Sequence, residues 1–334
     1  MEKIGIDALS FLIKENKDRR VLITFHSIGD TDSVTSAVSL SKYFTNARVA
    51  TPDIITANAS RILKRMGFES LGIGNNFDPN ADIVILTDVN SFEDCGEFRF
   101  QLEGFRGKII VIDHHSPKEI QKENVFVFND EGYNSAASIV FALLKKLDQG
   151  LDENTAMLLL AGIISDSADL RNSTPSTFMQ IGELLGIAHA EYPEILERME
   201  HVADAAARAR TMTDITKAKV DLVEGLLYVH GKAHAHANIA ADAAINIGAD
   251  VALFTAEDAK EVSFSARLRA PLDRRLGIHL GRIMKSLAGV INGNGGGHPC
   301  AAGAYGSLST NADEFEKRFL EEIVKMARGK AKVV

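Results

Sequence analysis

The chain has 334 residues, 46% of them hydrophobic, which is enough for two domains that each bury a core. Its formal net charge of -8 argues against the broad basic surface that holds duplex DNA, so no duplex DNA partner is expected. The two cysteines lie far apart without a CxxC pair, and no apolar run approaches the roughly 20 residues of a membrane span, so we expect a cytoplasmic protein with no disulfide framework and no membrane partner.

The residues up to 188 alternate apolar strand-like runs with helical patterns. This alternation is typical of a mostly parallel sheet covered by helices on both faces. The predicted strands are 21–25, 47–50, 83–87, 109–112 and 125–128. The predicted helices are 31–44, 58–66, 135–147 and 154–164. We therefore predict an α/β domain over residues 1–188.

Residues 189–219 are rich in Ala, Glu and Arg and show no strand pattern, so we interpret them as a helical linker. Strand and helix patterns resume beyond it, and they predict a smaller α/β domain over residues 220–334. Its predicted strands are 220–229, 251–255 and 262–268, and its predicted helices are 239–247, 276–288 and 313–326. A glycine cluster, Asn292 to Pro299, interrupts this second domain.

Three predicted strands of the first domain end in side chains that can bind metal. They are His26, Asp30 and Asp32 after the first, Asp88 after the second, and Asp113, His114 and His115 after the third. Asp166 adds a carboxylate where the apolar helix 154–164 stops. Because ligands usually bind at the carboxyl ends of parallel strands, we expect these residues to lie close together.

Each of these residues alone could be a helix cap or a packed histidine. Together they supply carboxylate and imidazole ligands, which suit Mn²⁺ or Mg²⁺, with Co²⁺ or Zn²⁺ as alternatives. So many carboxylates cannot share one pocket as free anions, so cations must neutralise them. Two divalent ions ~3.5–4 Å apart, bridged by one carboxylate, would activate water and hold phosphoryl oxygens. The array predicts hydrolysis of a phosphoester or phosphoanhydride.

The ordered pattern His26…Asp30-x-Asp32, Asp88, Asp113-His114-His115 and Asp166 resembles the four motifs of the DHH phosphoesterase superfamily. The sequence Gly295-Gly296-Gly297-His298, followed by Ala301-Ala302-Gly303, resembles the motif of the DHH-associated C-terminal domain. Chain length and this second motif point to the branch of nano-RNases, pAp phosphatases and dinucleotide phosphodiesterases, rather than to long RecJ-type exonucleases.

The resemblance implies two metal sites and two supporting residues. One metal would bind His26, Asp30 and Asp88, and the other would bind Asp32, Asp88, His114 and Asp166, with Asp88 as the bridge. Asp113 would orient a histidine from behind the ligands. His115 would contact a substrate phosphate or help to protonate the leaving group, and the sequence does not decide between the two roles.

In the second domain the resemblance implies a phosphate-binding surface. Arg267, in Ser265-Ala266-Arg267, is the expected arginine, with Arg269 as the alternate on the same strand face. Gly296 and Gly297 would let the backbone approach an anion, and His298 would add a side chain. The expected active site is then the cleft between the domains, which favours short substrates.

The first motif departs from the family pattern at two positions. Gly29 stands where proline is usual, and Thr31 stands where glycine is usual, so we expect some change in the geometry of this loop because a Cβ disfavours positive φ. The fourth motif ends in Ser167 to Leu170 instead of Thr-Gly-x-Phe, which affects local substrate contacts but keeps Asp166.

The predicted function is a Mn²⁺-dependent phosphodiesterase that converts short single-stranded oligonucleotides or linear dinucleotides to mononucleotides. Activity as a pAp phosphatase or cyclic di-AMP phosphodiesterase is a further option in the same site, and the resemblance is compatible with a homodimer. One alternative is an inorganic pyrophosphatase of the related DHH branch, which the glycine-histidine motif disfavours because that branch uses a different C-terminal domain. Another is a non-catalytic nucleotide sensor, which the intact ligand set disfavours.

Overall fold

The computed structural model describes residues 1–116, 118–167, 169–200, 205–234, 236–258, 261–307 and 311–331. They form two compact units, Met1–His201 and Val202–Val334. The predicted linker contains α8 (Tyr192–Met199), which belongs to the first unit, and α9 (Ala205–Lys217), which belongs to the second. None of the described helices combines the length and apolarity needed to cross a bilayer.

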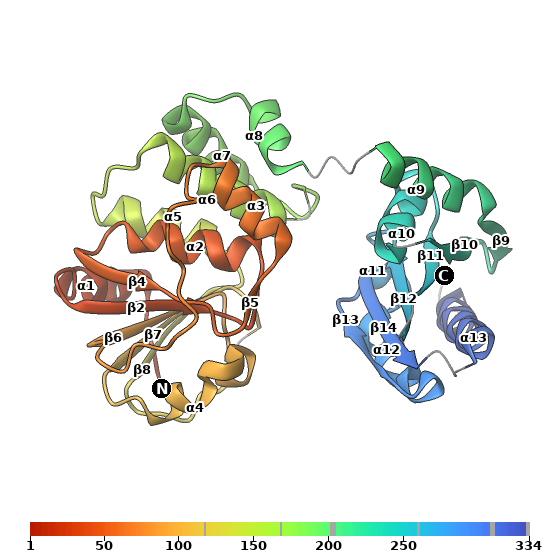
Figure 1. Ribbon diagram of the computed structural model, residues 1–334, viewed down its shortest axis with the longest axis horizontal. Coiled ribbons are helices and arrows are strands. Elements are labelled where there is room, and N and C mark those ends of the chain that lie inside the picture. The colour runs from red at the N-terminus through yellow and green to blue at the C-terminus, as the bar shows by residue number, and fades with distance from the viewer. Residues whose placement is uncertain are drawn as a thin grey trace. The chain divides into compact units, whose positions relative to one another are not determined.

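Unit 1 is built on a six-stranded sheet in the order β1-β8-β7-β6-β2-β4, with every neighbouring pair parallel (Figure 1). The strands are β1 (Glu2–Lys3), β2 (Arg20–Phe25), β4 (Asn46–Val49), β6 (Ile83–Thr87), β7 (Lys108–Asp113) and β8 (Val125–Asn129). The central strands are buried on both faces, which explains why their sequences are continuous apolar runs. The five strands predicted for this domain are therefore confirmed, with end shifts of at most one residue.

Helices cover both faces of this sheet. On one face lie α1 (Ile6–Glu15), α2 (Thr31–Ser41), α3 (Ala57–Arg65), α5 (Ala136–Lys146), α6 (Glu153–Asp166) and α7 (Pro175–Ala188). On the other lie the 3-10 segment η1 (Phe92–Phe98) and α4 (Arg99–Gly104). A small two-stranded parallel sheet, β3 (Ile28–Gly29) with β5 (Ile54–Ile55), lies in the loops that follow β2 and β4.

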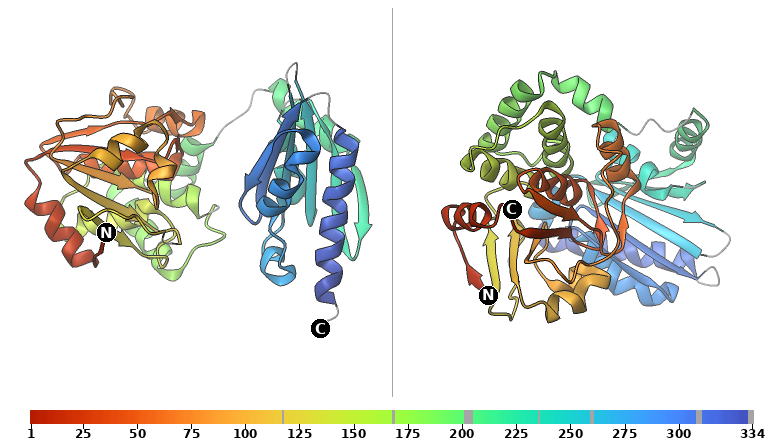
Figure 2. Two further views of the ribbon diagram at one scale, coloured as in Figure 1. Left: turned by 90° about the horizontal axis from the view of Figure 1, so that it is seen from below. Right: turned by 60° about the vertical axis from the view of Figure 1, so that its left-hand side comes forward.

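Unit 2 has a second six-stranded sheet, in the order β13-β14-β12-β11-β10-β9, in which only β10 and β11 are parallel. The strands are β9 (Lys219–Val223), β10 (Leu226–Ala233), β11 (Val251–Glu257), β12 (Glu261–Leu268), β13 (Asn294–Gly297) and β14 (Ala301–Ser307). One face packs on α9 and α10 (Ala237–Asn246). The other packs on α11 (Leu272–Leu276), α12 (Leu280–Leu287), η2 (Ala288–Ile291) and the long α13 (Ala312–Ala331) (Figure 2).

Three expectations for unit 2 were wrong in detail. The segment 220–229 is a hairpin rather than one strand, because Glu224 and Gly225 both have positive φ and reverse the chain between β9 and β10. The predicted helix 276–288 is two helices, because Gly277 takes the left-handed conformation and ends α11. The glycine cluster is an edge strand, β13, paired with β14, and neither strand was predicted.

Candidate metal centre

The predicted ligands of unit 1 converge at the carboxyl ends of three adjacent parallel strands. His26 follows β2, Asp88 follows β6, and His114 follows β7. Helix α2 begins beside them, with Asp30 as its N-cap accepting a hydrogen bond from the Ser33 N–H at 3.0 Å. The remaining ligands are Asp32, in the first turn of α2, and Asp166, the last residue of α6.

Asp88 is in contact with histidines from two different strand ends. Its Oδ2 lies 3.5 Å from His26 Nε2, and its Oδ1 lies 3.3 Å from His114 Nε2. His26 Nε2 is also 3.5 Å from Asp30 Oδ2. Asp88 has a φ of 60°, a strained value for a residue with a Cβ, and such strain is typical of functional sites. This one carboxylate therefore connects the two halves of the cluster.

The other half of the cluster surrounds His114. Its Nε2 lies 3.2 Å from Asp166 Oδ2 and 3.9 Å from Asp32 Oδ2. The described residues form three overlapping sets whose ligand atoms all lie within 4.8 Å of one another: His26, Asp30 and Asp88; Asp32, His114 and Asp166; and Asp88, His114 and His115. The structure thus brings together all the residues that the sequence nominated as metal ligands.

Two buried atoms at the centre of the cluster favour bound cations. Asp88 Oδ1 and His114 Nε2 make no hydrogen bond with any described residue, although both are shielded from solvent. A buried polar atom without a partner is costly, and a carboxylate oxygen and an imidazole nitrogen are both metal donors. The residues present therefore fit divalent metal ions.

Asp32 is fixed by backbone amides that the sequence did not reveal. Its Oδ2 accepts a hydrogen bond from the Ala136 N–H at 2.6 Å, and its Oδ1 accepts one from the Ala137 N–H at 2.9 Å. Both amides belong to the first turn of α5, where free N–H groups attract a carboxylate. Ser135, the N-cap of α5, marks this helix start in the sequence, but its proximity to Asp32 is purely tertiary.

Asp113 belongs to none of the three ligand sets and is fully buried at the end of β7. Its Oδ1 lies 2.9 Å from His115 Nδ1, and its Oδ2 accepts a hydrogen bond from Asn129 Nδ2 at 3.0 Å. Asn129 also donates to the His115 carbonyl at 2.7 Å. The histidine that Asp113 orients is therefore His115, whose half-exposed ring keeps Nε2 free, and Asn129 is a supporting residue that sequence reasoning missed.

The carboxylates raise the pKa of the histidines of the metal-free site. Burial lowers the pKa of His26, but hydrogen bonds and charge from Asp30 and Asp88 outweigh burial and raise it to about 10. The hydrogen bond to Asp113, opposed by burial and helped by Asp88, raises the pKa of His115 to about 9. Both imidazoles are therefore protonated at neutral pH in the metal-free site, and a cation that binds His26 must displace its proton.

The carboxylates themselves divide into two kinds. Burial raises the pKa of Asp88, but the His114 and His26 imidazoles outweigh burial and hold it well below its usual range. Burial and the Asp88 charge raise the pKa of Asp166 to about 6, and the same causes raise that of Asp32. Asp88 is thus a permanent anion, whereas Asp32 and Asp166 take up protons at a higher pH than an ordinary aspartate does in the absence of metal.

The departures in the first motif fit the local backbone. Thr31 is helical and does not have a positive φ, so its Cβ does not distort the loop, and its hydroxyl accepts a hydrogen bond from Asn58 Nδ2 at 2.9 Å. At Gly29 a Cβ would lie 2.6 Å from Phe25 Cε2, so a side chain does not fit there without movement. The expectation that the Cβ of Thr31 changes the loop geometry is therefore wrong. In the fourth motif, Ala168 lies outside the described residues.

In unit 2, the residues expected to bind phosphate lie at one end of the sheet. Arg267 pairs with Ala301 and Gly297 pairs with Ala302, so the two flank β14 at adjacent positions. Gly296 is the preceding residue of β13, and His298 follows that strand with an exposed side chain. Helix α12 packs closely against β13 and requires a glycine at this contact. A Cβ on Gly281 would lie 1.9 Å from the Gly297 carbonyl oxygen.

The Arg267 guanidinium has a partner that the sequence did not indicate. Its Nε and a terminal nitrogen donate to the two carboxylate oxygens of Asp242, on α10, at 2.6 and 3.2 Å. Arg269, the alternate, pairs with Asp250. A phosphate at Arg267 therefore competes with a bidentate carboxylate.

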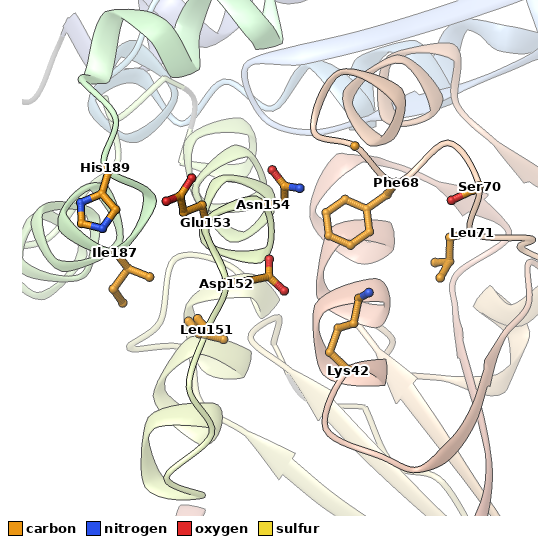
Figure 3. Close-up of a pocket in the computed structure, with 11 residues that line it drawn as sticks. Lys42, Phe68, Ser70, Leu71, Leu151, Asp152, Glu153, Asn154, Ile187 and His189 are labelled. Carbon is orange, nitrogen blue, oxygen red and sulfur yellow. The ribbon is translucent and has the colours of Figure 1, made fainter.

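A separate pocket of about 660 Å³ occupies unit 1, between Lys42, at the end of α2, and Asp152 to Asn154, at the start of α6 (Figure 3). The ligands Asp32 and Asp166 lie at the opposite ends of the same two helices. None of the predicted site residues lines this pocket, so it is distinct from the candidate metal centre.

Comparison with known proteins gives a consistent family assignment. Residues 20–163 match the model of the DHH family, N-terminal domain, and residues 225–325 match the model of the DHHA1 domain. An uncharacterized protein of Methanocaldococcus jannaschii is 25% identical over 324 residues, covering 94% of this chain and 93% of that protein. A probable manganese-dependent inorganic pyrophosphatase of Streptococcus thermophilus is 29% identical over 145 residues, covering only 42% of each chain.

One solved structure shares the whole fold. The exopolyphosphatase-related protein from Bacteroides fragilis superposes with a TM-score of 0.78 at 17% identity, covering 97% of both chains. This likeness extends over both units and confirms the predicted α/β architecture.

Proposed function

The chain belongs to the DHH family and carries a DHHA1 domain, so it is a hydrolase of phosphoester or phosphoanhydride bonds, and we propose that it hydrolyses short oligonucleotides or linear dinucleotides to mononucleotides. The observation that carries the proposal is the pairing of an intact ligand cluster with a DHHA1 domain. Single phosphorylated nucleotides such as pAp, and cyclic di-AMP, are the further substrates to test in the same site.

The proposed cofactors are two divalent ions, with Mn²⁺ preferred. His26, Asp30 and Asp88 would hold one ion, and the second would be held by Asp32, Asp88, His114 and Asp166. The sharing of Asp88 between His26 and His114 supports the bridging role. Bound divalent ions acidify water and neutralise charge on phosphoryl oxygens.

The chain's own residues orient the substrate and move protons. Asp113 occupies Nδ1 of His115, so Nε2 is the atom of this ring left to contact a phosphate oxygen or the leaving group. Substrates whose leaving groups differ in pKa separate these roles. If His115 protonates the leaving group, His115→Ala slows substrates with poor leaving groups most. If it only binds phosphate, all substrates lose rate equally.

In unit 2 we propose that Arg267, Gly296, Gly297 and His298 bind a substrate phosphate. Their support is their common position at one end of the sheet beside β14. Arg267→Lys is the sharpest variant, because lysine keeps the charge but loses the bidentate geometry. We expect KM for a dinucleotide to rise by about tenfold or more with a smaller change in kcat.

Two exposed isoleucines near the ligands favour a nucleotide over pyrophosphate. Ile28 and Ile54 pair across β3 and β5 with side chains 60% and 59% exposed. Ile28 lies between the ligands His26 and Asp30 in the sequence, so this apolar pair is close to the metal centre. A nucleoside has apolar surface to bury there, whereas pyrophosphate has none.

An inorganic pyrophosphatase is the second candidate, since probable manganese-dependent pyrophosphatases match part of the chain. Those matches cover only 42% of the first relative and 61% of another, whereas the DHHA1 model matches residues 225–325 of this chain. The difference in the second domain is the reason to prefer nucleotide substrates.

The test compares rates with Mn²⁺ on a 5′-phosphorylated dinucleotide, pAp, cyclic di-AMP, longer single strands and pyrophosphate. We expect the dinucleotide to be cleaved fastest and Asp88→Asn to abolish turnover, with Asp7→Asn on the exposed surface as the matched control. Strong activity on pyrophosphate alone would reverse the choice of substrate. Binding without turnover in saturating Mn²⁺ would identify a sensor instead of an enzyme.

A further inference from the structure

Strand β9 ends the sheet of unit 2, and no described strand pairs with its outer edge. It is joined to β10 by the two-residue turn Glu224-Gly225, with φ values of 50° and 81°, which are the positive values of a type I′ turn. Val223 and Leu226 flank this turn and face each other. The Arg328 side chain donates to Glu224 at 2.8 Å and fixes the turn to α13.

The hairpin determines which backbone groups of β9 remain free. In a two-residue hairpin the flanking pair is hydrogen-bonded, and hydrogen-bonded pairs alternate along an antiparallel ladder. Val223, Asp221 and Lys219 therefore direct their N–H and C=O groups toward β10. Val220 and Leu222 direct theirs outward. An edge of this kind is a template for another strand.

The same two residues also expose large apolar side chains. Val220 is 63% exposed and Leu222 is 73% exposed, and the alternation of a strand places them on one face. Leu227, directly opposite Leu222 on β10, extends this apolar surface and is 41% exposed. Lys219 and Asp221 lie on the other face. The apolar face of the β9 edge thus lacks the charges that usually protect an edge strand from pairing.

We propose that the outer edge of β9 pairs antiparallel with β9 of a second copy of this chain, with Val220 opposite Val220. Three symmetric registers place Val220 or Leu222 of one copy opposite Val220 or Leu222 of the other. The register with Val220 opposite Leu222 sets Asp221 against Asp221, which is repulsive. The register with Leu222 opposite Leu222 sets Val220 against the turn residue Glu224. Only the register centred on Val220 sets Lys219 of each copy opposite Asp221 of the other.

This pairing joins two six-stranded sheets into one and stabilises them in two ways. The Lys219–Asp221 contacts form twice, on the face where Asp221 also accepts from His230 at 3.0 Å. On the opposite face, Val220, Leu222 and Leu227 of both copies cover one another. The charge pattern selects a second copy as the partner, because the strand is complementary to itself in this register.

Sedimentation velocity on the full chain tests the interface and its charges. The wild type is a dimer, and Lys219→Glu weakens it by about tenfold or more because two attractive pairs become repulsive. The double variant Lys219→Glu with Asp221→Lys restores the dimer, since the opposite charges are exchanged. The matched control is Lys285→Glu, the same charge change on exposed α12, which leaves the dimer unchanged.

Cysteine cross-linking tests the register. Hydrogen-bonded antiparallel residues have Cα atoms about 5.5 Å apart, within the range of a disulfide. Val220→Cys therefore forms a covalent dimer on mild oxidation. Leu222→Cys, at a more exposed position but opposite Ala218 of the other copy, forms far less of the covalent dimer. The oxidised wild type controls for Cys95, which is buried, and Cys300, which is partly buried.

Three results would overturn the proposal. The first is a wild type that stays monomeric across its soluble concentration range. The second is a dimer whose stability does not change with Lys219→Glu. The third is a Leu222→Cys variant that cross-links as well as Val220→Cys. None of these results depends on the enzymatic activity.

Discussion

At the scale of single residues, Asp113 separates orientation from metal binding. It contacts His115 and Asn129 but lies outside the ligand sets, so a change there alters the imidazole and leaves the metal donors in place. In Asp113→Asn an N–H₂ group replaces one carboxylate oxygen, so the variant loses an acceptor either for the Asn129 N–H₂ or for the His115 ring. We expect turnover to fall by about 10–100-fold with a smaller loss of Mn²⁺ affinity, measured by kinetics and calorimetry.

The pKa of His115 provides a readout that a general loss of packing would not give. Asp113 is the main cause that raises this pKa to about 9, so Asp113→Asn should return it toward the ordinary value of about 6.5. An NMR titration of the metal-free protein measures the shift directly. If turnover falls while the His115 pKa stays near the wild-type value, Asp113 acts by some route other than its hydrogen bond to this ring.

The same residues predict that metal binding depends on pH. The pKa of His26 is raised to about 10 and that of Asp166 to about 6, so in the metal-free site His26 keeps its proton at neutral pH while Asp166 has mostly lost its own. A cation must displace the His26 proton. The apparent Mn²⁺ affinity should therefore rise with pH, by about tenfold per pH unit for each proton displaced, until His26 titrates.

Calorimetry in buffers of different ionisation enthalpy measures the protons released by Mn²⁺. We expect at least one proton per protein at neutral pH, from His26, and more where the ligands His114 and Asp32, whose pKa values are also raised, lose theirs. In His26→Asn the release should fall by about one proton, together with the affinity, whereas His189→Asn, which changes a distant exposed histidine, should release as many protons as the wild type. A wild-type affinity that is flat with pH would show that His26 is not a ligand.

At the scale of elements, Gly162 allows α6 to approach α2. A Cβ there would lie 2.4 Å from Thr35 Oγ1 and 3.1 Å from Asp32 Oδ1. We expect Gly162→Ala to lower the free energy of unfolding by about 1–3 kcal/mol and to displace Asp32, so that Mn²⁺ affinity falls as well. Chemical denaturation in EDTA isolates the effect on stability from the effect on metal binding.

Gly182→Ala is the matched control for Gly162→Ala. Gly182 lies in the interior of α7, and a Cβ there meets nothing within 4 Å. Alanine in an exposed helix should therefore raise the free energy of unfolding by roughly 0.5–1 kcal/mol. Equal effects at the two glycines would contradict the close packing of α2 on α6.

The elements that the sequence predicted well are those with a strong local signal. The strands of unit 1 are buried on both faces, so their apolar runs are continuous and end where the ligands begin. The strand β13 is the opposite case, because Asn294 to Gly297 has no apolar pattern and exists only by pairing with β14. Contacts between elements could not be predicted from the sequence either. The α5 amides that hold Asp32, and Asp242 beside Arg267, come from segments distant in sequence.

At the scale of the whole molecule, all the predicted metal ligands lie in unit 1, whereas unit 2 supplies none of them. Mn²⁺ should therefore stabilise the two units unequally. At about 100 times the dissociation constant, a ligand stabilises the fold that binds it by roughly 2.7 kcal/mol, which corresponds to about 100-fold slower amide exchange. We expect this protection in β2, β6 and β7, and no change in β10, β11 and β12.

Hydrogen exchange with and without Mn²⁺, read by mass spectrometry, resolves the two units in one experiment. Asp88→Asn serves as the control, because it keeps the size of the side chain but removes the negative charge shared by two ligand sets, and its unit 1 should show little protection by Mn²⁺. Equal protection of both units in the wild type would show that metal binding is coupled to unit 2. Protection that persists in Asp88→Asn would place the bound ion away from the cluster, because Asp88 is the carboxylate that joins its two halves.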